Sequence, residues 1–336
     1  MKVFLPIKGL CITILLLGAL DFAWAEEKPV WPEPPEMARI RYVSSIYSSQ
    51  DLGIEKKFWS KVVDFVLGRD SRSESLVKPL SLCVDGMGRL YVTDQGLRTL
   101  HVFDQKDKSY QRIDHAGSTP FISPVDVVVS QSRKIFISDS EIGSVFILNE
   151  KGRLEYAIEG YFSRPTGLCI YQNRLYVADT GYHKIFIFNL DGTYLFEFGQ
   201  QGIGPGEFNF PVFMGTGKHL YINDSMNFRV QAVNESHKIT NIFGEQGDVQ
   251  GTFMRSKGIA SDSQDHIYVV DNLFNVFQIF NAEGQLLLVV GSPGNGHGQF
   301  NMPSGIWIDN NDKIYIADTM NGRIQIFQYL RSSSND

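Results

Sequence analysis

One five-residue pattern recurs six times along this chain: an aliphatic residue, an aromatic one, another aliphatic one, a variable residue and an aspartate. The first copy occupies residues 90–94 and the last occupies residues 314–318. The copies are spaced 40 to 47 residues apart, and they end at Asp94, Asp139, Asp179, Asp224, Asp271 and Asp318. A repeat of this length indicates an array of like units that stack to bury their apolar faces. The pattern therefore constrains the fold before any other feature is considered.

Each copy extends into four short strands. One strand precedes the pattern, as at residues 165–170, and a third strand follows it, as at residues 324–327. A polar turn then leads to a fourth strand, as at residues 194–198. Four strands joined by hairpin turns form an antiparallel meander. Because one meander cannot cover both its faces and six arranged radially can, the sequence predicts an all-β, six-bladed β-propeller with four-stranded antiparallel blades over residues 76–330.

The sixth copy has no room for a fourth strand, because its third strand ends at Phe327 and the sequence stops at Asp336. Residues 38–43 alternate polar and apolar side chains ahead of the first complete repeat. We expect residues 38–47 to form the outermost strand of the last blade, which would close the ring and remove its exposed edges. The propeller then spans residues 38–330, with residues 331–336 as a tail.

The first 25 residues have the pattern of a secretory signal peptide. Lys2 and Lys8 precede an apolar run at residues 10–20, and Ala23-Trp24-Ala25 fits a cleavage site. The run is too short for a comfortable membrane span, although an uncleaved anchor is the alternative. We therefore expect a periplasmic or secreted protein without a transmembrane span in the mature chain. Residues 26–37 are Pro-rich and are expected to form an extended spacer.

Residues 54–68 have helical periodicity and would interrupt the strands. An apolar stripe on this predicted amphipathic helix contains Phe58, Trp59, Val62 and Phe65, and the opposite face is rich in lysine. The helix is interpreted either as a lid packed on the propeller or as a docking element for a partner or a membrane surface.

Composition narrows the class of partner. The formal net charge is −6 and hydrophobic residues make up 43% of the chain, which is ordinary for a globular protein. An acidic protein is a poor candidate for nucleic-acid binding, which depends on neutralising phosphates. Cys83 and Cys169 occupy equivalent positions two repeats apart, too distant for a disulfide, so we interpret both as small buried residues.

Two segments resemble a known family. Residues 198–211 resemble the inter-blade signature of NHL repeats, and residues 318–327 resemble its turn and third strand. The fourth and sixth copies match best, and the resemblance covers residues 76–330. The chain is identified as a member of the NHL-repeat six-bladed β-propeller family, typical of bacterial exported proteins. Some NHL-like propellers are amidating lyases and related six-bladed propellers are lactonases, each with a channel metal, but none of their ligand residues maps onto this chain.

The six repeated aspartates allow two readings, a structural one and a metal or acid–base one. Six copies of one residue at one topological position favour a common structural role. An aspartate at a strand end can accept hydrogen bonds from the N–H groups of a turn, and Lys184, Arg229 and Arg323 follow at the spacing of a partner. We therefore interpret the aspartates as turn locks.

The turns that follow the aspartates and the crossings between blades are predicted to share one face of the propeller. Binding residues are expected where the copies differ or carry the turn signature: Arg98, Tyr182, His183, Lys184, Asn227, Phe228, Arg229, His297, Asn321 and Arg323. We predict no catalytic residue, no metal ligand and no cofactor from the spacing of the residues.

The sequence thus favours an exported, non-catalytic binding or scaffold protein. Its loop face would bind a protein, peptide or glycan, and the chain is expected to be monomeric and not to bind nucleic acid. The alternative is a propeller enzyme, lyase or lactonase-like, that depends on a metal in its channel. A sensor domain is a third possibility.

Overall fold

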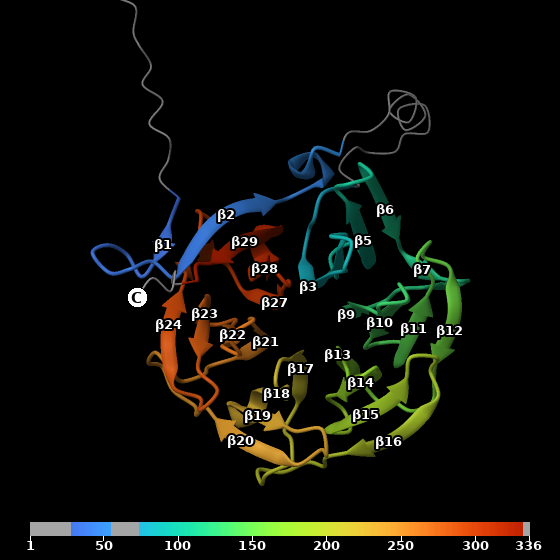
Figure 1. Cartoon of the computed structure of the whole chain (residues 1–336). Helices are drawn as coiled ribbons and strands as arrows, with labels where there is room; N and C mark the ends of the chain where they lie inside the picture. The colour runs from blue at the N-terminus through green and yellow to red at the C-terminus, as the bar shows by residue number, and fades with distance from the viewer. Residues whose placement is uncertain (1–27, 55–73, 332–336) are drawn as a thin grey trace, which may run out of the picture.

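Six antiparallel sheets form a closed ring around a central axis (Figure 1). The computed structural model describes residues 28–54 and 74–331. The signal-peptide prediction for residues 1–25 and nearly all of the helix predicted at 54–68 lie outside those residues. The predicted fold class is confirmed, with one blade for each copy of the repeat.

Blades one to five each contain four strands that run in chain order from the axis to the rim. Blade one contains β3 (Pro79–Val84), β4 (Leu90–Asp94), β5 (Thr99–Asp104) and β6 (Ser109–Ile113). Blade two contains β9 (Pro124–Val129), β10 (Ile135–Asp139), β11 (Ser144–Leu148) and β12 (Leu154–Ile158). Blade three contains β13 (Pro165–Tyr171), β14 (Arg174–Asp179), β15 (Lys184–Asn189) and β16 (Tyr194–Phe198).

The later blades repeat this order. Blade four contains β17 (Pro211–Thr216), β18 (Leu220–Asp224), β19 (Arg229–Val233) and β20 (Ile239–Phe243). Blade five contains β21 (Ser256–Ser261), β22 (Ile267–Asp271), β23 (Val276–Phe280) and β24 (Leu286–Val290). Blade six contains β27 (Pro303–Ile308), β28 (Lys313–Asp318), β29 (Arg323–Tyr329), β2 (Ile40–Ile46) and β1 (Val30–Trp31).

Shorter elements decorate the ring. Two-residue strands lie in crossings between blades, and short 3₁₀ helices lie at turns. The strands are β7 (His115–Ala116), β8 (Thr119–Pro120), β25 (Ser292–Pro293) and β26 (Gln299–Phe300). The helices are η1 (Ser49–Leu52), η3 (Ser225–Asn227) and η4 (Thr319–Asn321). None of the described helices has the length and apolar character needed to cross a membrane.

Strand β2 closes the ring as predicted. It pairs antiparallel with β29, with Ile40 opposite Tyr329 and Ile46 opposite Ile324. In Figure 1 this N-terminal strand lies alongside the C-terminal strand of the same blade. Ile40 and Tyr42 are buried in the cluster between blades five and six. The closing strand therefore supplies both hydrogen bonds and core side chains to the last blade.

The repeated pattern reflects the burial of the second strand of each blade. All five residues of β4 are buried, because neighbouring blades cover both faces of the sheet. In five of the six copies the aromatic residue is a tyrosine, whose hydroxyl needs a partner. The hydroxyls of Tyr91, Tyr268 and Tyr315 each donate to an aspartate six residues earlier in the chain, in the turn that precedes the strand. In these three blades the tyrosine therefore ties the second strand to that turn.

The core consists of apolar clusters between adjacent blades. One cluster joins Cys83 and Tyr91 of blade one to Val127 and Ile137 of blade two. Cys83 and Cys169 are both free and buried, which confirms their reading as core residues.

Candidate functional site

The six repeated aspartates fasten the crossings to the turns. Asp139 accepts hydrogen bonds from the backbone N–H groups of Ile122 and Ser123, at the end of the crossing into its own blade. It also accepts from the N–H groups of Glu141 and Ile142 in the turn that follows it. All six aspartates are fully buried. Their prediction as turn locks is confirmed, and the turns and crossings share one face, which we call the lock face.

Blades four and six add side chains to this lock. The guanidinium of Arg323 donates to Asp318 at 2.7 Å and to the carbonyl oxygens of Gly296 and Gln299 at 2.8 Å. The amide of Asn321 donates to Asp318 and to the carbonyl oxygen of Gly294. Blade four repeats these contacts with Asp224, Asn227 and Arg229.

These bonds give five predicted binding residues an internal role. In blade three, Lys184 forms an ion pair with Glu197 at 2.6 Å on the neighbouring strand. The side chains of Asn227, Arg229, Asn321 and Arg323 hold the crossings, so each of the five already has a partner within the chain. A further contact of these side chains with a ligand remains a prediction.

The remaining predicted residues lie apart from one another. The Nδ1 atom of His183 accepts from the N–H of Phe210, and its ring packs edge-on against Phe210. His297 stacks on Tyr42 of the closing strand, with ring centroids 4.5 Å apart. Arg98 lines an open hollow of about 550 Å³ between blades one and two. Among the described residues, no hydrogen bond, ion pair or ring contact joins these three side chains to one another.

Tyr182 and Phe228 lie in turns of the lock face as predicted. Tyr182 is exposed, and Phe228 is half-buried with its backbone in the left-handed region at φ 54°. The last residue of the turn between the second and third strands has a positive φ in all six blades. These residues are Arg98, Gly143, His183, Phe228, Asn275 and Gly322. Glycine tolerates this conformation best, and four blades carry a larger residue there.

An arc of exposed apolar side chains covers the lock face from blade four round to blade one. We define this apolar arc by seven residues whose exposed fractions range from 36% to 52%: Val77, Phe210, Met226, Met254, Leu273, Met302 and Met320. Four of them end a crossing, and three occupy the second position of a turn. Exposed apolar residues that recur at matched positions of one face differ from the scattered single ones that any protein surface carries.

Hydrogen bonds place the members of the arc next to one another. The turn of each blade contacts the start of the next inner strand: Ser225 donates to the carbonyl oxygen of Ser256, and Thr319 to that of Pro79. Between these, Asn272 donates to the carbonyl oxygen of Pro303. Each turn that carries an arc residue is therefore bonded to the start of the inner strand that follows a crossing residue of the arc.

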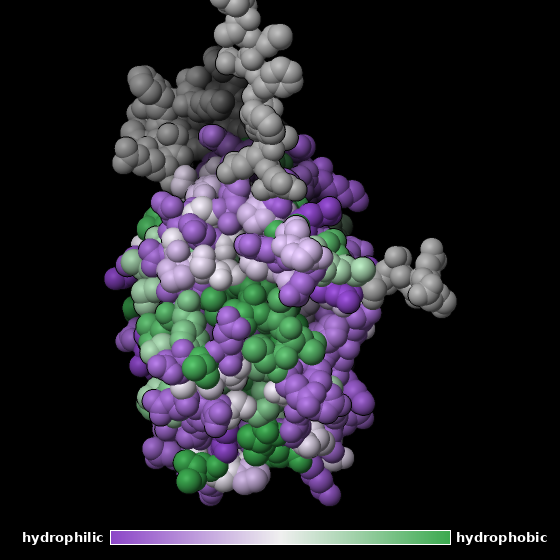
Figure 2. All heavy atoms as spheres, turned by 90° about the vertical axis from the view of Figure 1, so that its left-hand side faces the viewer, coloured by the Kyte–Doolittle hydropathy of each residue, from purple (hydrophilic) through white to green (hydrophobic). Residues whose placement is uncertain are grey.

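The outer wall of the propeller also exposes apolar side chains. Figure 2 shows this wall on the side of β24, where apolar side chains form patches between hydrophilic ones. Exposed apolar residues of the outermost strands include Leu154, Tyr156 and Leu287. They supply matched positions for control substitutions away from the lock face.

Cations without partners accompany the apolar arc. Lys78 and Arg255 directly follow Val77 and Met254 of the arc, and Arg164 occupies the matching position of blade three. Across residues 28–54 and 74–331, the side chains of these three cations and of Lys257 have neither a hydrogen bond nor an ion pair. The lock face is thus apolar along its arc and positively charged at its centre.

Lys257 stands out among these cations. Its burial in β21 and the nearby charges of Arg255 and Arg164 lower the pKa of the lysine to about 8. A lysine with this pKa remains mostly charged at neutral pH and loses its charge in mildly alkaline solution.

A plug of apolar side chains closes the central channel beneath the lock face. Leu80 of blade one, Val125 of blade two, and Val212 and Phe213 of blade four belong to one packed cluster. Blades two and four are not neighbours in the ring, so these side chains meet across the axis. The inner strands approach closely at this level, since a Cβ added to Gly258 would lie 2.5 Å from the carbonyl oxygen of Ser304.

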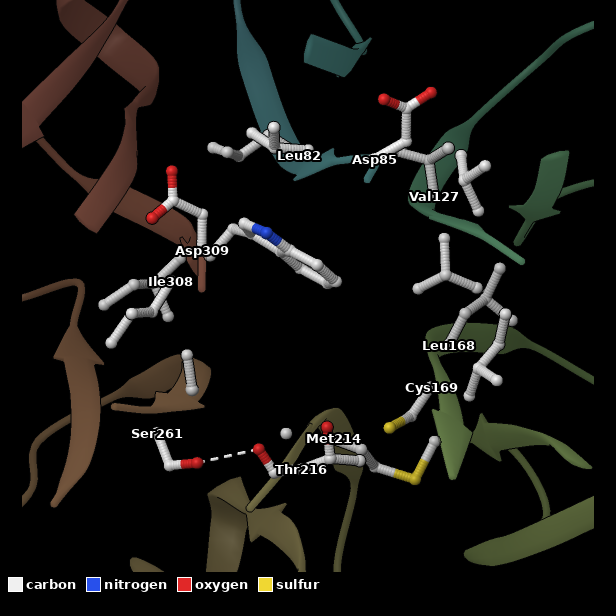
Figure 3. A pocket seen from close by; sticks show the side chains of 18 of the residues that line it. Leu82, Asp85, Val127, Leu168, Cys169, Met214, Thr216, Ser261, Ile308 and Asp309 are labelled. Carbon is white, nitrogen blue, oxygen red and sulfur yellow. Dashed lines mark hydrogen bonds between the residues drawn. The ribbon is translucent and has the colours of Figure 1, made fainter. Parts of the chain in front are cut away.

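A cavity of about 940 Å³ lies on the far side of the plug and opens at the turns between the first and second strands. Leu82, Val127, Leu168, Cys169, Met214 and Ile308 surround the central space (Figure 3). At its mouth the hydroxyl of Ser261 donates to the carbonyl oxygen of Thr216 at 2.7 Å. Among the described residues, no group of three or more His, Cys, Asp or Glu side chains could hold a metal ion.

Neither the apolar arc nor this cavity was predicted from the sequence. The signal for the arc was present at the second turn position, where Met226, Leu273 and Met320 of blades four to six contrast with Gly96 and Gly181. A comparison of the six copies at that position alone would have located the apolar half of the lock face.

Comparison with known families agrees with the geometry. Residues 159–227 and 258–332 match the family described as 6-bladed beta-propeller. The chain is a six-bladed β-propeller. Protein brain tumor of Drosophila melanogaster is 30% identical over 92 residues, which amount to 26% of this propeller chain and 9% of that protein. The propeller chain therefore spans under a tenth of the length of that curated relative.

Solved structures share the fold at low sequence identity. A virginiamycin B lyase from Staphylococcus aureus, solved with quinupristin, has a TM-score of 0.55 and 14% identity; the match covers 75% of this propeller and 95% of the lyase. An auxiliary nutrient binding protein from Bacteroides thetaiotaomicron has a TM-score of 0.59 and 15% identity, with 76% and 70% covered. These likenesses establish the fold and leave the binding function and the enzyme alternative as predictions.

Proposed function

We propose that this propeller is an exported, non-catalytic binding protein whose lock face takes an acidic, amphipathic segment of a partner protein. The observation that carries the proposal is the apolar arc beside the unpartnered cations Lys78, Arg164, Arg255 and Lys257. Export rests on the signal peptide predicted at residues 1–25.

The arc has the composition of a protein contact surface. Methionine and aromatic side chains are enriched at the centres of such interfaces, and four of the seven arc residues are methionines. Methionine is flexible and polarisable, so it can adapt to partner side chains of different shape. A partner that covers this arc would remove apolar area from water. Each Å² so buried stabilises the complex by roughly 25 cal/mol, from which the costs of association are subtracted.

The charges select among the ligand classes. A glycan needs many hydrogen-bonding side chains, whereas six of the seven arc residues are aliphatic or methionine and the seventh is Phe210. The unpartnered cations favour a segment that carries carboxylates, because complementary charge guides association and disfavours the wrong partner. These two properties together favour a protein segment with acidic and apolar residues over a peptide of basic character.

We also propose that the repeats are of the NHL type. The support comes from the side-chain locks of blades four and six, in which an Asn and an Arg follow the aspartate at the same spacing in both blades.

A selection with displayed peptides tests the lock-face function. Random peptides are enriched on the mature protein and then counter-screened on a variant with Met226→Ser, Leu273→Ser and Met320→Ser. A matched control carries Leu154→Ser, Tyr156→Ser and Leu287→Ser on the outer wall. We expect enriched peptides that combine acidic and apolar residues, with affinity about tenfold weaker for the arc variant and unchanged for the control.

The same selection can contradict the proposal. Peptides without acidic residues, equal binding by the arc variant, or no enrichment at all would each speak against an acidic amphipathic ligand on the lock face. Circular dichroism of both variants confirms that the blades remain folded.

A further inference from the structure

The cavity opposite the lock face forms a second candidate site. We propose that it binds an organic cation with an apolar, aromatic body, which would lie against Trp307 while its ammonium group remains at the acidic mouth. Nothing in the lock-face function requires this cavity, because the apolar plug separates the two.

The cavity is a cup with one open end. Its lining begins at the third residue of the inner strands, as at Ser81 and Asp126, and continues to the turns that follow those strands. The plug formed by Leu80, Val125 and Phe213 closes the other end. A volume of about 940 Å³ is within the range of sites that enclose small organic molecules.

One residue of the wall breaks the repeat. The residue paired with the repeated aromatic position is small in blades one to five and is a tryptophan in blade six: Cys83, Val128, Cys169, Gly215, Ala260 and Trp307. Trp307 lines the cavity and is only partly buried. Because the other five blades build the same fold without a large side chain there, the fold does not require the indole. The indole of Trp307 forms an aromatic surface in the wall of the cavity.

The rest of the wall is suited to an apolar body. Five apolar side chains face the central space from blades one, two, three, four and six (Figure 3): Leu82, Val127, Leu168, Met214 and Ile308. Their side chains, together with the indole, would remove most of a ligand's apolar surface from water. Aromatic ligands gain additionally from contact with an aromatic side chain.

The mouth of the cup is acidic. Asp85, Asp262, Asp309 and Asp312 line it, and each accepts hydrogen bonds within or between the turns there. Burial alone would raise the pKa of Asp85, but bonds from the backbone and side chain of Arg89 lower it. Burial would also raise the pKa of Asp312, but hydrogen bonds from Ser263 and Arg331 lower it. Both groups therefore carry their negative charge at neutral pH.

Two of these four carboxylates, Asp262 and Asp309, have no arginine or lysine partner among the described residues, and the Nδ1 atom of His266 lies 2.8 Å from Asp262. Arg133 also lines the cavity, but it forms an ion pair with Glu150 at 2.5 Å. Arg331 pairs with Asp312 at 2.7 Å, and Arg89 pairs with Asp85. Asp262 and Asp309 therefore leave the mouth with an excess of negative charge, which favours a cationic head group over an anionic one.

Three indole compounds that differ in charge test the proposal: tryptamine, neutral tryptophol and anionic indoleacetate. Binding to the full mature chain is measured by calorimetry and ligand-observed NMR. We expect tryptamine to bind about tenfold more tightly than indoleacetate, with tryptophol between them. Replacing Trp307 by Ala should weaken tryptamine binding about tenfold, while the selected lock-face peptides should bind as before.

A matched pair of variants tests the role of the mouth. Asn310 lines the cavity and the adjacent Asn311 does not, although both are exposed. We expect Asn310→Lys to weaken tryptamine binding several-fold and to leave indoleacetate binding unchanged. Asn311→Lys should change the affinity for each of the two compounds less than about twofold. The absence of tryptamine binding at about 5 mM, equal affinity for the two charged indoles, or equal effects of the two lysines would each overturn the proposal.

Discussion

Asp126 is the buried carboxylate that joins three blades beside the plug. It accepts hydrogen bonds from the hydroxyl of Ser81 at 2.6 Å, from the N–H of Leu168 at 2.7 Å and from the N–H of Val127 at 2.8 Å. Burial outweighs these bonds and raises its pKa to about 6, from 3.8. The native state therefore binds this proton more tightly than the unfolded chain does.

The pKa of Asp126 predicts a pH-dependent stability. A raised pKa contributes stability that is fully present below pH 3.8 and is lost as the pH rises through about 6. Relative to Asp126→Asn, which does not titrate, the native protein should lose about 2 kcal/mol of unfolding free energy between pH 4 and pH 7. Urea unfolding at a series of pH values measures this difference. Asp107→Asn, at an exposed position, is the control, and an equal slope for both variants would contradict the assignment.

The lowered pKa of Lys257 predicts that ligand binding on the lock face depends on pH. Its pKa is lowered to about 8, so the lysine loses its charge as the pH rises from 7 to 9. Binding of an acidic peptide should weaken several-fold over that range, and Lys257→Arg should remove most of the change, because arginine remains charged. Fluorescence polarisation with a selected peptide measures the effect. A steep pH profile retained by the arginine variant would show that another group is responsible.

The inner strands set the tightest packing between elements. A Cβ on Gly258 would lie 2.5 Å from the carbonyl oxygen of Ser304 and 2.7 Å from the backbone nitrogen of Ile306 in blade six. Gly258→Ala should therefore lower the free energy of unfolding by about 2 kcal/mol, since backbone of the next blade must move. Gly86→Ala is the matched control, because no atom lies within 4 Å of its added Cβ. Equal denaturation midpoints for the two variants would refute this account of the inner ring.

The closing strand β2 joins the first and last parts of the fold. Deleting residues 38–43 would expose the edge of β29 and remove Ile40 and Tyr42 from the core. We expect loss of the cooperative thermal transition or a large fall in Tm, and the milder Ile40→Ala should cost about 3 kcal/mol. An unchanged Tm after the deletion would contradict ring closure by this strand.

Elements with a periodic or alternating pattern could be predicted from the sequence, and individual side-chain contacts could not. The Asp-terminated strands and the closing strand follow from periodicity and alternation, so their prediction is confirmed. Arg229 and Arg323 were predicted as binding residues, because the sequence does not show that their guanidinium groups reach carbonyl oxygens of the preceding crossing. Trp307 and Lys257 were not among the predicted site residues, since their roles depend on how the inner strands converge.

The whole molecule presents two faces of opposite character. The lock face carries the apolar arc and unpartnered cations, and the opposite face carries a cup with an acidic mouth. The plug between them means that a ligand on one face need not touch the other. The repeats build both faces from the same six strands, and the differences among the copies give each face its chemistry.

Hydrogen–deuterium exchange of the mature protein, with and without a selected acidic peptide, shows which face of the propeller holds the ligand. We expect slower exchange at the turns and crossing ends of blades four to six and of blade one, at residues 76–78, 209–210, 225–228, 254–257, 272–275, 301–302 and 319–322. Exchange at the turns around the cup, at residues 85–88 and 309–312, should not change. Slower exchange confined to the cup, or to the outermost strands, would contradict ligand binding on the lock face.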